Sequence, residues 1–177
     1  RIRGKGSFVS NLMIERPPII QGFSDEIEKM GMQPSSQLIE FASVHPEKAI
    51  QDALKLDGND LIYSINRLRL ADQSPMAIEF SYLPVKLFPN LERFSLTEQS
   101  LYDIIKTHYH VQFGLLAQQV QAVRLSKANA TLLLGTSSGF ALSVRRTLYS
   151  IGNLPIEYSE TLYHPNKYSV RISITQK

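Results

Sequence analysis

The sequence contains no cysteine, and no hydrophobic run approaches the roughly 20 residues that a membrane-spanning helix needs. Without cysteine the chain can form no disulfide, no thiolate zinc site and no cysteine nucleophile. The first 30 positions also lack the apolar core of a signal peptide. We therefore expect a cytoplasmic protein that has no membrane partner.

Sequence motifs of several enzyme classes are missing as well. There is no GxGxxG or Walker-type glycine loop for a nucleotide and no GxSxG elbow for a serine hydrolase. Among the four histidines only His108 and His110 are close, and no HExxH or comparable metal-binding motif occurs. The sequence therefore predicts no metal site, no cofactor and no recognisable catalytic group.

The chain has 177 residues, 43% of them hydrophobic, which is typical of one compact domain with a small appendage. Its formal charge is +3, with 19 basic and 16 acidic residues. Arg1, Arg3 and Lys5 account for the whole surplus, so the basic character is local to the N-terminus. Because the sequence begins without methionine inside a basic, glycine-punctuated segment, we expect Arg1 to be an internal cut in a longer chain.

Hydrophobic spacing and turn residues predict an α+β fold with about six antiparallel strands joined mostly by short turns. Ser24 is a plausible N-cap for the first helix and Gly31 its stop, while Pro46 is expected to open the second helix. The expected helices are 24–30, 46–55, 97–108 and 126–133. The expected strands are 37–44, 60–70, 75–83, 111–124 and 168–175, with a further hairpin across 151–153.

The hairpin between residues 60 and 83 offers the first candidate site. On a strand Arg67 and Arg69 share one face, whereas Leu68 points to the other. A turn centred on Gln73 would pair Arg67 with Glu79. Two adjacent guanidinium groups can bind a phosphate or carboxylate. The alternative is a solvated sheet face on which each arginine pairs with an acid.

The second hairpin offers a similar polar face. A turn centred on Gly152 would place Glu157 opposite Thr147, whose face also carries Arg145. The face of Glu157 also carries Ser159, Thr161 and Tyr163. Such a face suits a polyhydroxylated ligand, but it is also typical of an exposed sheet surface.

Four stretches of the chain resemble a known family. The opening RIRGKGSFVSN is similar to the last wing strand of a GntR-type winged helix-turn-helix. The stretches GFSDEIEKMGMQPSSQLI, INRLRLADQSPMAIEFSYLP and IEYSETLYHPNKYSVRISI resemble the UTRA effector-binding domain of HutC-like GntR regulators. The implied organisation is a wing remnant at 1–12, a linker at 13–22 and a UTRA effector-binding and dimerisation domain at 23–177.

The resemblance implies a homodimeric transcription regulator, usually a repressor, with a chorismate lyase-like sheet flanked by short helices. Operator DNA would be bound through a missing N-terminal domain, and Arg1, Arg3 and Lys5 would be the remnant that lies near DNA. The effector would be a phosphorylated sugar, an amino-sugar phosphate or a related anion. The implied site residues are Phe23, Ser24, Arg67 and Arg69 for the anion and Glu79, Glu157 and Tyr163 for the hydroxyls or ring.

One position departs from the family pattern. Many sugar-phosphate sensors carry an I-S-R-A-x-Q sequence whose serine touches phosphate, and the matching stretch here has Gly114 instead. Either backbone amides and the arginines hold the anion, or the effector differs. Two other functions remain open at this point: a chorismate lyase-like enzyme and a dimerisation module without a ligand.

Overall fold

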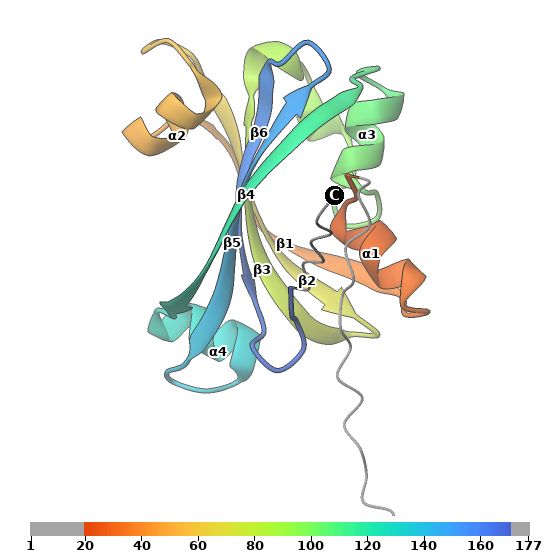
Figure 1. The fold of residues 1–177 in the computed structure, drawn as a ribbon, viewed down its shortest axis with the longest axis vertical. Coiled ribbons are helices and arrows are strands. Elements are labelled where there is room, and N and C mark those ends of the chain that lie inside the picture. The colour runs from red at the N-terminus through yellow and green to blue at the C-terminus, as the bar shows by residue number, and fades with distance from the viewer. Residues whose placement is uncertain (1–19, 171–177) are drawn as a thin grey trace, which may run out of the picture.

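A computed structural model describes residues 20–170, which form one antiparallel six-stranded sheet with short helices on both faces (Figure 1). The strand order is β1-β2-β3-β6-β5-β4, so the predicted α+β class is confirmed. The strands are β1 (Pro34–Val44), β2 (Ile62–Ala71), β3 (Ser74–Pro84), β4 (Phe113–Arg124), β5 (Phe140–Ser150) and β6 (Pro155–Tyr163). The helices are α1 (Phe23–Lys29), α2 (Lys48–Leu54), α3 (Leu101–Thr107) and α4 (Lys127–Leu134), with single 3-10 turns η1 (Val85–Leu87) and η2 (Leu91–Arg93).

The helices divide between the two faces of the sheet. Helices α1 and α3 cover one face, and α2 and α4 lie on the other (Figure 1). On the first face Ile27 of α1 belongs to one buried cluster with Tyr163, and Ile105 of α3 belongs to another with Leu148. Burial of these apolar side chains holds α1 and α3 against the sheet, and it also covers whatever polar groups lie between them.

The hairpin of β2 and β3 has the predicted register. Its two-residue turn consists of Asp72 and Gln73, with φ of 46° and 66°. Two positive φ values give the type I′ turn whose twist suits adjacent antiparallel strands. Arg67 therefore pairs with Glu79, as predicted, while Leu68 packs on the opposite face against α4.

The register predicted for β5 and β6 is wrong by one residue. The pairing shifts between Leu148 and Tyr149, so Glu157 lies opposite Leu148 and not opposite Thr147. An extra residue in one strand exchanges the faces of everything beyond it. Consequently Arg146, rather than Arg145, shares the face of Glu157.

The predicted N-cap of the first helix is also wrong. Gly22 is the N-cap of α1, and its amide donates to the carboxylate of Asp25 at 3.3 Å. Ser24 lies in the first turn, where its hydroxyl is free of a capping role. Gly31, with φ of 75°, follows the helix as expected.

Other boundaries differ by a few residues. Helix α2 begins two positions after Pro46, and α3 begins only after its N-cap Ser100, whose hydroxyl accepts the amide of Asp103. Residues 168–170 are not part of a strand. The rest of the strand expected at 168–175, the wing remnant at 1–12 and most of the linker lie outside the described residues.

Candidate functional site

The arginine pair of β2 is buried, which excludes the solvated sheet face as an explanation. Arg67 and Arg69 are only 2% and 3% exposed. Arg67 forms a 2.5 Å ion pair with Glu79 and donates a 3.4 Å hydrogen bond to the carbonyl of Leu96. Burying two cations beside each other is costly unless carboxylates or ligands compensate them.

Arg69 connects the sheet to the start of α1. Its guanidinium donates to Ser24 Oγ at 3.2 Å and lies 4.5 Å from the ring centre of Phe23. Its distance to the Glu79 carboxylate is 3.7 Å, so Glu79 interacts more closely with Arg67 than with Arg69. Burial, followed by the charge of Arg67, lowers the pKa of Arg69 to about 10, which still leaves it protonated at neutral pH.

Two carboxyl groups in this cluster, the partly buried Glu79 and the buried Glu157, have opposite pKa shifts. Burial raises the pKa of Glu79, but the charges of Arg67 and Arg69 outweigh it and hold that pKa below its usual value. Burial and the nearby charge of Glu79 raise the pKa of Glu157 to about 7, despite a 2.9 Å hydrogen bond from Tyr102. Glu157 is thus partly protonated at neutral pH, and the cluster carries more positive than negative charge.

A polar belt continues across the same sheet face. Arg146 of β5 donates a 3.4 Å hydrogen bond to the hydroxyl of Tyr163, whose ring stacks on Tyr168 at 3.6 Å. The remaining buried polar members are small hydroxyls: Ser81, Ser159 and Thr161. Within the sheet interior these groups offer hydrogen-bond donors and acceptors in place of hydrocarbon.

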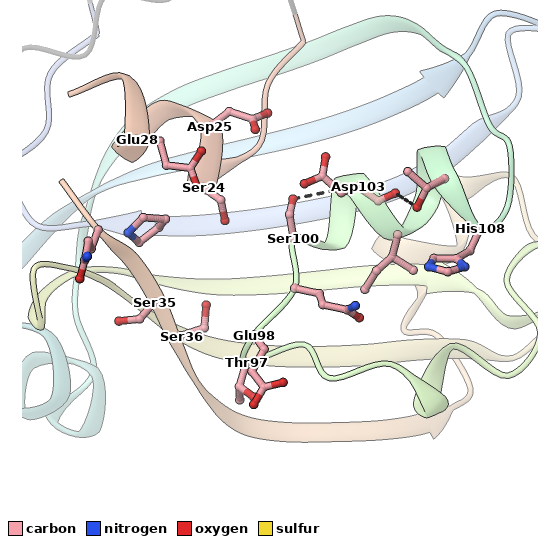
Figure 2. A pocket seen from close by; sticks show the side chains of 15 residues that line it. Ser24, Asp25, Glu28, Ser35, Ser36, Thr97, Glu98, Ser100, Asp103 and His108 are labelled. Atoms are coloured by element: carbon pink, nitrogen blue, oxygen red, sulfur yellow. Dashed lines mark hydrogen bonds between the residues drawn. The ribbon is translucent and has the colours of Figure 1, made fainter. Parts of the chain in front are cut away.

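An open pocket of about 450 Å³ lies beside two residues that neighbour Arg69, although its lining contains neither Arg67 nor Arg69 (Figure 2). Its lining includes Ser24, the hydrogen-bond partner of Arg69, and Ser36, the residue paired with Arg69 across β1 and β2. Ser100, at the start of α3, contributes another of the hydroxyls in the lining. This volume is within the range of small-molecule sites. Acidic side chains complete part of the lining: Asp25, Glu28, Glu98 and Asp103.

Gly114 lies apart from this pocket. It lines a different hollow with Lys106 and Phe113. A Cβ at position 114 would lie 2.6 Å from the backbone oxygen of Ser150, so the β4–β5 pairing has no room for a serine there. Ser100, which the sequence prediction missed, supplies a hydroxyl to the pocket; its signal was a serine directly before the apolar helix 101–107.

The other predicted site residues lie in one region. Phe23, Ser24, Arg67, Arg69 and Glu79 form a connected set of contacts. Glu157 and Tyr163 lie on the same face, on β6. Electrostatic interaction with Glu79 raises the pKa of Glu157, and electrostatic interaction with Tyr163 raises the pKa of Arg69. The predicted DNA-contact residues Arg1, Arg3 and Lys5 fall outside the described part of the chain.

Residues 20–170 contain no group of metal ligands and no helix suited to a membrane. No three histidine or carboxylate side chains in this range come together as metal ligands would. No helix in this range combines the length and apolar character required to cross a bilayer.

Comparison with known proteins gives consistent matches. The UTRA domain family matches residues 29–169. The HTH-type transcriptional repressor NagR of Bacillus subtilis is 27% identical over 172 residues, covering 96% of this chain and 70% of NagR. The mannosyl-D-glycerate transport/metabolism system repressor MngR of Escherichia coli is 20% identical over 177 residues, covering 99% of this chain and 73% of MngR. These relatives are transcriptional regulators, not enzymes.

Solved structures show the same fold. The effector domain of PhnF from Mycobacterium smegmatis superposes with a TM-score of 0.84 at 17% identity, covering 92% of this chain and 100% of that one. A GntR-family transcriptional regulator from Bacillus cereus superposes with a TM-score of 0.71 at 25% identity, covering 80% of this chain and 99% of that one.

Proposed function

We propose that this chain, which belongs to the UTRA family of effector-binding domains in GntR-type transcriptional regulators, senses a small phosphorylated metabolite such as a sugar phosphate or amino-sugar phosphate. Binding would change how the DNA-binding part of the complete regulator, a cytoplasmic homodimer, occupies its operator. MngR is by name the repressor of a system for a glycosylated acid, which agrees with a carbohydrate-derived effector.

The buried arginine pair beside the pocket carries this proposal. Arg67 and Arg69 share the single well-ionised carboxylate Glu79, and the Nε atoms of both lack hydrogen-bond partners among the described residues. A bound phosphate would supply the missing negative charge and accept charge-assisted hydrogen bonds. Hydroxyls of Ser24 and Ser100 can donate to the same anion, since both line the pocket.

The remaining polar groups suit a carbohydrate. Carboxylates accept hydrogen bonds from sugar hydroxyls, and Glu79 and Glu157 both face this region from the sheet. The acidic lining contributed by Asp25 and Asp103 would also accept from hydroxyls or stabilise an amino group. An effector with an anionic end and a hydroxyl-rich or cationic end matches both halves of the site.

Contacts of Arg69 provide a route from effector to regulator. Arg69 holds both Phe23 and Ser24, the first two residues of α1. An anion bound to the Arg69 guanidinium would compete with Ser24 for the hydrogen bond that Arg69 donates. Loss of that hydrogen bond would allow α1 to shift. A coupling free energy of about 1–3 kcal/mol would alter operator occupancy by roughly 5- to 150-fold.

Calorimetric titration tests the proposal. The panel is glucose, mannose and glucosamine 6-phosphates, measured on the wild type, on Arg69→Ala and on a control, Arg145→Ala. Arg145 pairs with Glu160 on the opposite face of the sheet. We expect binding by the wild type and the control, with at least about tenfold weaker binding by Arg69→Ala. Equal affinity in Arg69→Ala would overturn the assigned anion site, and absence of binding to every phosphate would overturn phosphate sensing and favour a ligand-free dimerisation module.

A further inference from the structure

Arg146 is a buried cation that forms no ion pair among those identified in residues 20–170. It is 7% exposed and lies on β5 between Val144 and Leu148, two fully buried residues of the face that α1 and α3 cover. Its one hydrogen bond among the described residues runs to the Tyr163 hydroxyl at 3.4 Å, and its Nε has no partner there. The ion pairs identified for the arginines of this sheet join Arg67 and Arg69 to Glu79 and Arg145 to Glu160, and none of them involves Arg146.

Neighbouring arginines show how unusual this is. Arg67, which is equally buried, has Glu79 directly opposite it, and Arg145, the preceding residue of β5, pairs with Glu160 at 3.1 Å. A buried guanidinium that lacks such a partner destabilises the fold. A residue of this kind is typical of a site whose compensating charge arrives with a ligand.

Arg146 is connected to Arg69 through Tyr163. Arg69 pairs with Ala77, and Ala77 pairs in turn with Tyr163, so Tyr163 lies in the same row of the sheet. The Tyr163 hydroxyl accepts the hydrogen bond from Arg146. Electrostatic interaction with Tyr163 also raises the pKa of Arg69 and so favours its charged form. Tyr163 therefore lies between two cationic groups that face the same region.

The charges carried by the strands on this face do not balance. Three arginines, Arg67, Arg69 and Arg146, lie on the strands with one well-ionised carboxylate, Glu79. The acidic side chains of the pocket wall and the buried Glu26 of α1 lie outside the strands and are not part of this count. Glu157, whose pKa burial and Glu79 raise to about 7, contributes only part of a second negative charge. One monoanionic group cannot neutralise the difference, whereas a phosphate monoester carries a charge close to −2 at neutral pH.

We propose that Arg146 is a specificity-determining residue of the effector site, which acts with Arg69 to select a doubly charged phosphate monoester over a singly charged ester or carboxylate. This inference rests on the proposed function, because it assigns a charge requirement to the same site. It adds Arg146, a residue of β5 on the same face of the sheet, to the groups that recognise the anion.

The 6-sulfates of the same sugars test this charge requirement, because a sulfate monoester has the shape of a phosphate monoester but only one negative charge. Each 6-phosphate is compared with its 6-sulfate by calorimetry at pH 7.5. The proteins are the wild type, Arg146→Gln and the surface control Arg145→Gln. We expect the wild type and Arg145→Gln to bind the phosphate at least about tenfold more tightly, and Arg146→Gln to reduce that preference to about threefold or less.

The results distinguish the role proposed for Arg146 from the proposed phosphate sensing. Phosphate binding with an unchanged preference in Arg146→Gln, or an equal loss of affinity for both esters, would overturn the role of Arg146 and leave phosphate sensing intact. Failure of the wild type to bind any phosphate would overturn both. Arg146→Lys keeps the charge without the forked donors, so it should bind both esters more weakly and retain the preference. Equal affinity of Arg146→Lys for the two esters would overturn the proposal independently of how the glutamine variant folds.

Discussion

Glu157 should make the stability of the ligand-free chain fall as the pH rises. Its pKa is about 7 in the folded state, against 4.5 for an ordinary glutamate, because of burial and the charge of Glu79. Between these two values the folded state retains a proton that the unfolded state has lost. The free energy of unfolding therefore decreases as the pH rises from about 4.5 to 7 and levels off above it. A shift of this size corresponds to about 3 kcal/mol at most.

Replacement of Glu157 by glutamine removes the titration while retaining an oxygen that can accept from Tyr102. We expect Glu157→Gln to match the wild type near pH 5 and to exceed its free energy of unfolding by up to about 3 kcal/mol at pH 8. Urea unfolding at pH 5, 6, 7 and 8 measures the difference. The control is Glu160→Gln, because Glu160 lies partly exposed on the opposite face and pairs with Arg145.

Other titrating groups do not mimic this result. Burial lowers the pKa of His164, which makes stability increase with pH near neutrality, but His164 is present in both proteins and cancels in the difference. Glu79 has a lowered pKa, so it titrates below this pH window. A difference between wild type and Glu157→Gln that stays constant from pH 5 to 8 would refute the argument.

Three further tests address local features of the fold, each by urea unfolding. Gly114→Ser should cost roughly 1–3 kcal/mol, because its Cβ would meet a backbone oxygen of β5 at 2.6 Å, while Gly58→Ser, with open space around its Cβ, should be nearly neutral. Ser100→Ala and Ser126→Ala should each cost about 0.5–2 kcal/mol as lost N-caps, but only Ser100→Ala should also weaken phosphate binding in calorimetry. Gln73→Gly should stabilise the chain by up to about 1 kcal/mol, since position 73 has φ of 66°; a loss of stability would contradict the strain assigned to this turn.

Local signals in the sequence were sufficient for most elements of the fold. A two-residue turn with polar central residues set the β2–β3 register, and alternation placed Leu68 on the face opposite Arg67. The helix expected at 126–133 is α4, which begins directly after its N-cap Ser126. Such signals act within a few residues, so they can be recognised without knowledge of the tertiary structure.

Burial of the arginine pair could not be predicted from such local signals. Alternation shows which side chains share a face, but it does not show what covers that face. Here the cover comes from distant segments: Ser24 is 45 residues from its partner Arg69, and Leu96 is 29 residues from its partner Arg67. The choice between a solvated face and a buried site was therefore decided by tertiary packing, which period-two spacing does not encode.

The most consequential error of sequence-based prediction came from a single irregular pair of residues. Between Leu148 and Tyr149 the register of β5 against β6 shifts by one, and a shift of one exchanges the two faces of a strand. Without it, Arg145 would face the site and Arg146 would lie on the opposite face. With it, Arg145, which pairs with the surface carboxylate of Glu160, lies on the outer face, and Arg146 lies on the inner face beside Tyr163. The irregularity thus determines which of the two arginines shares the face of Glu157.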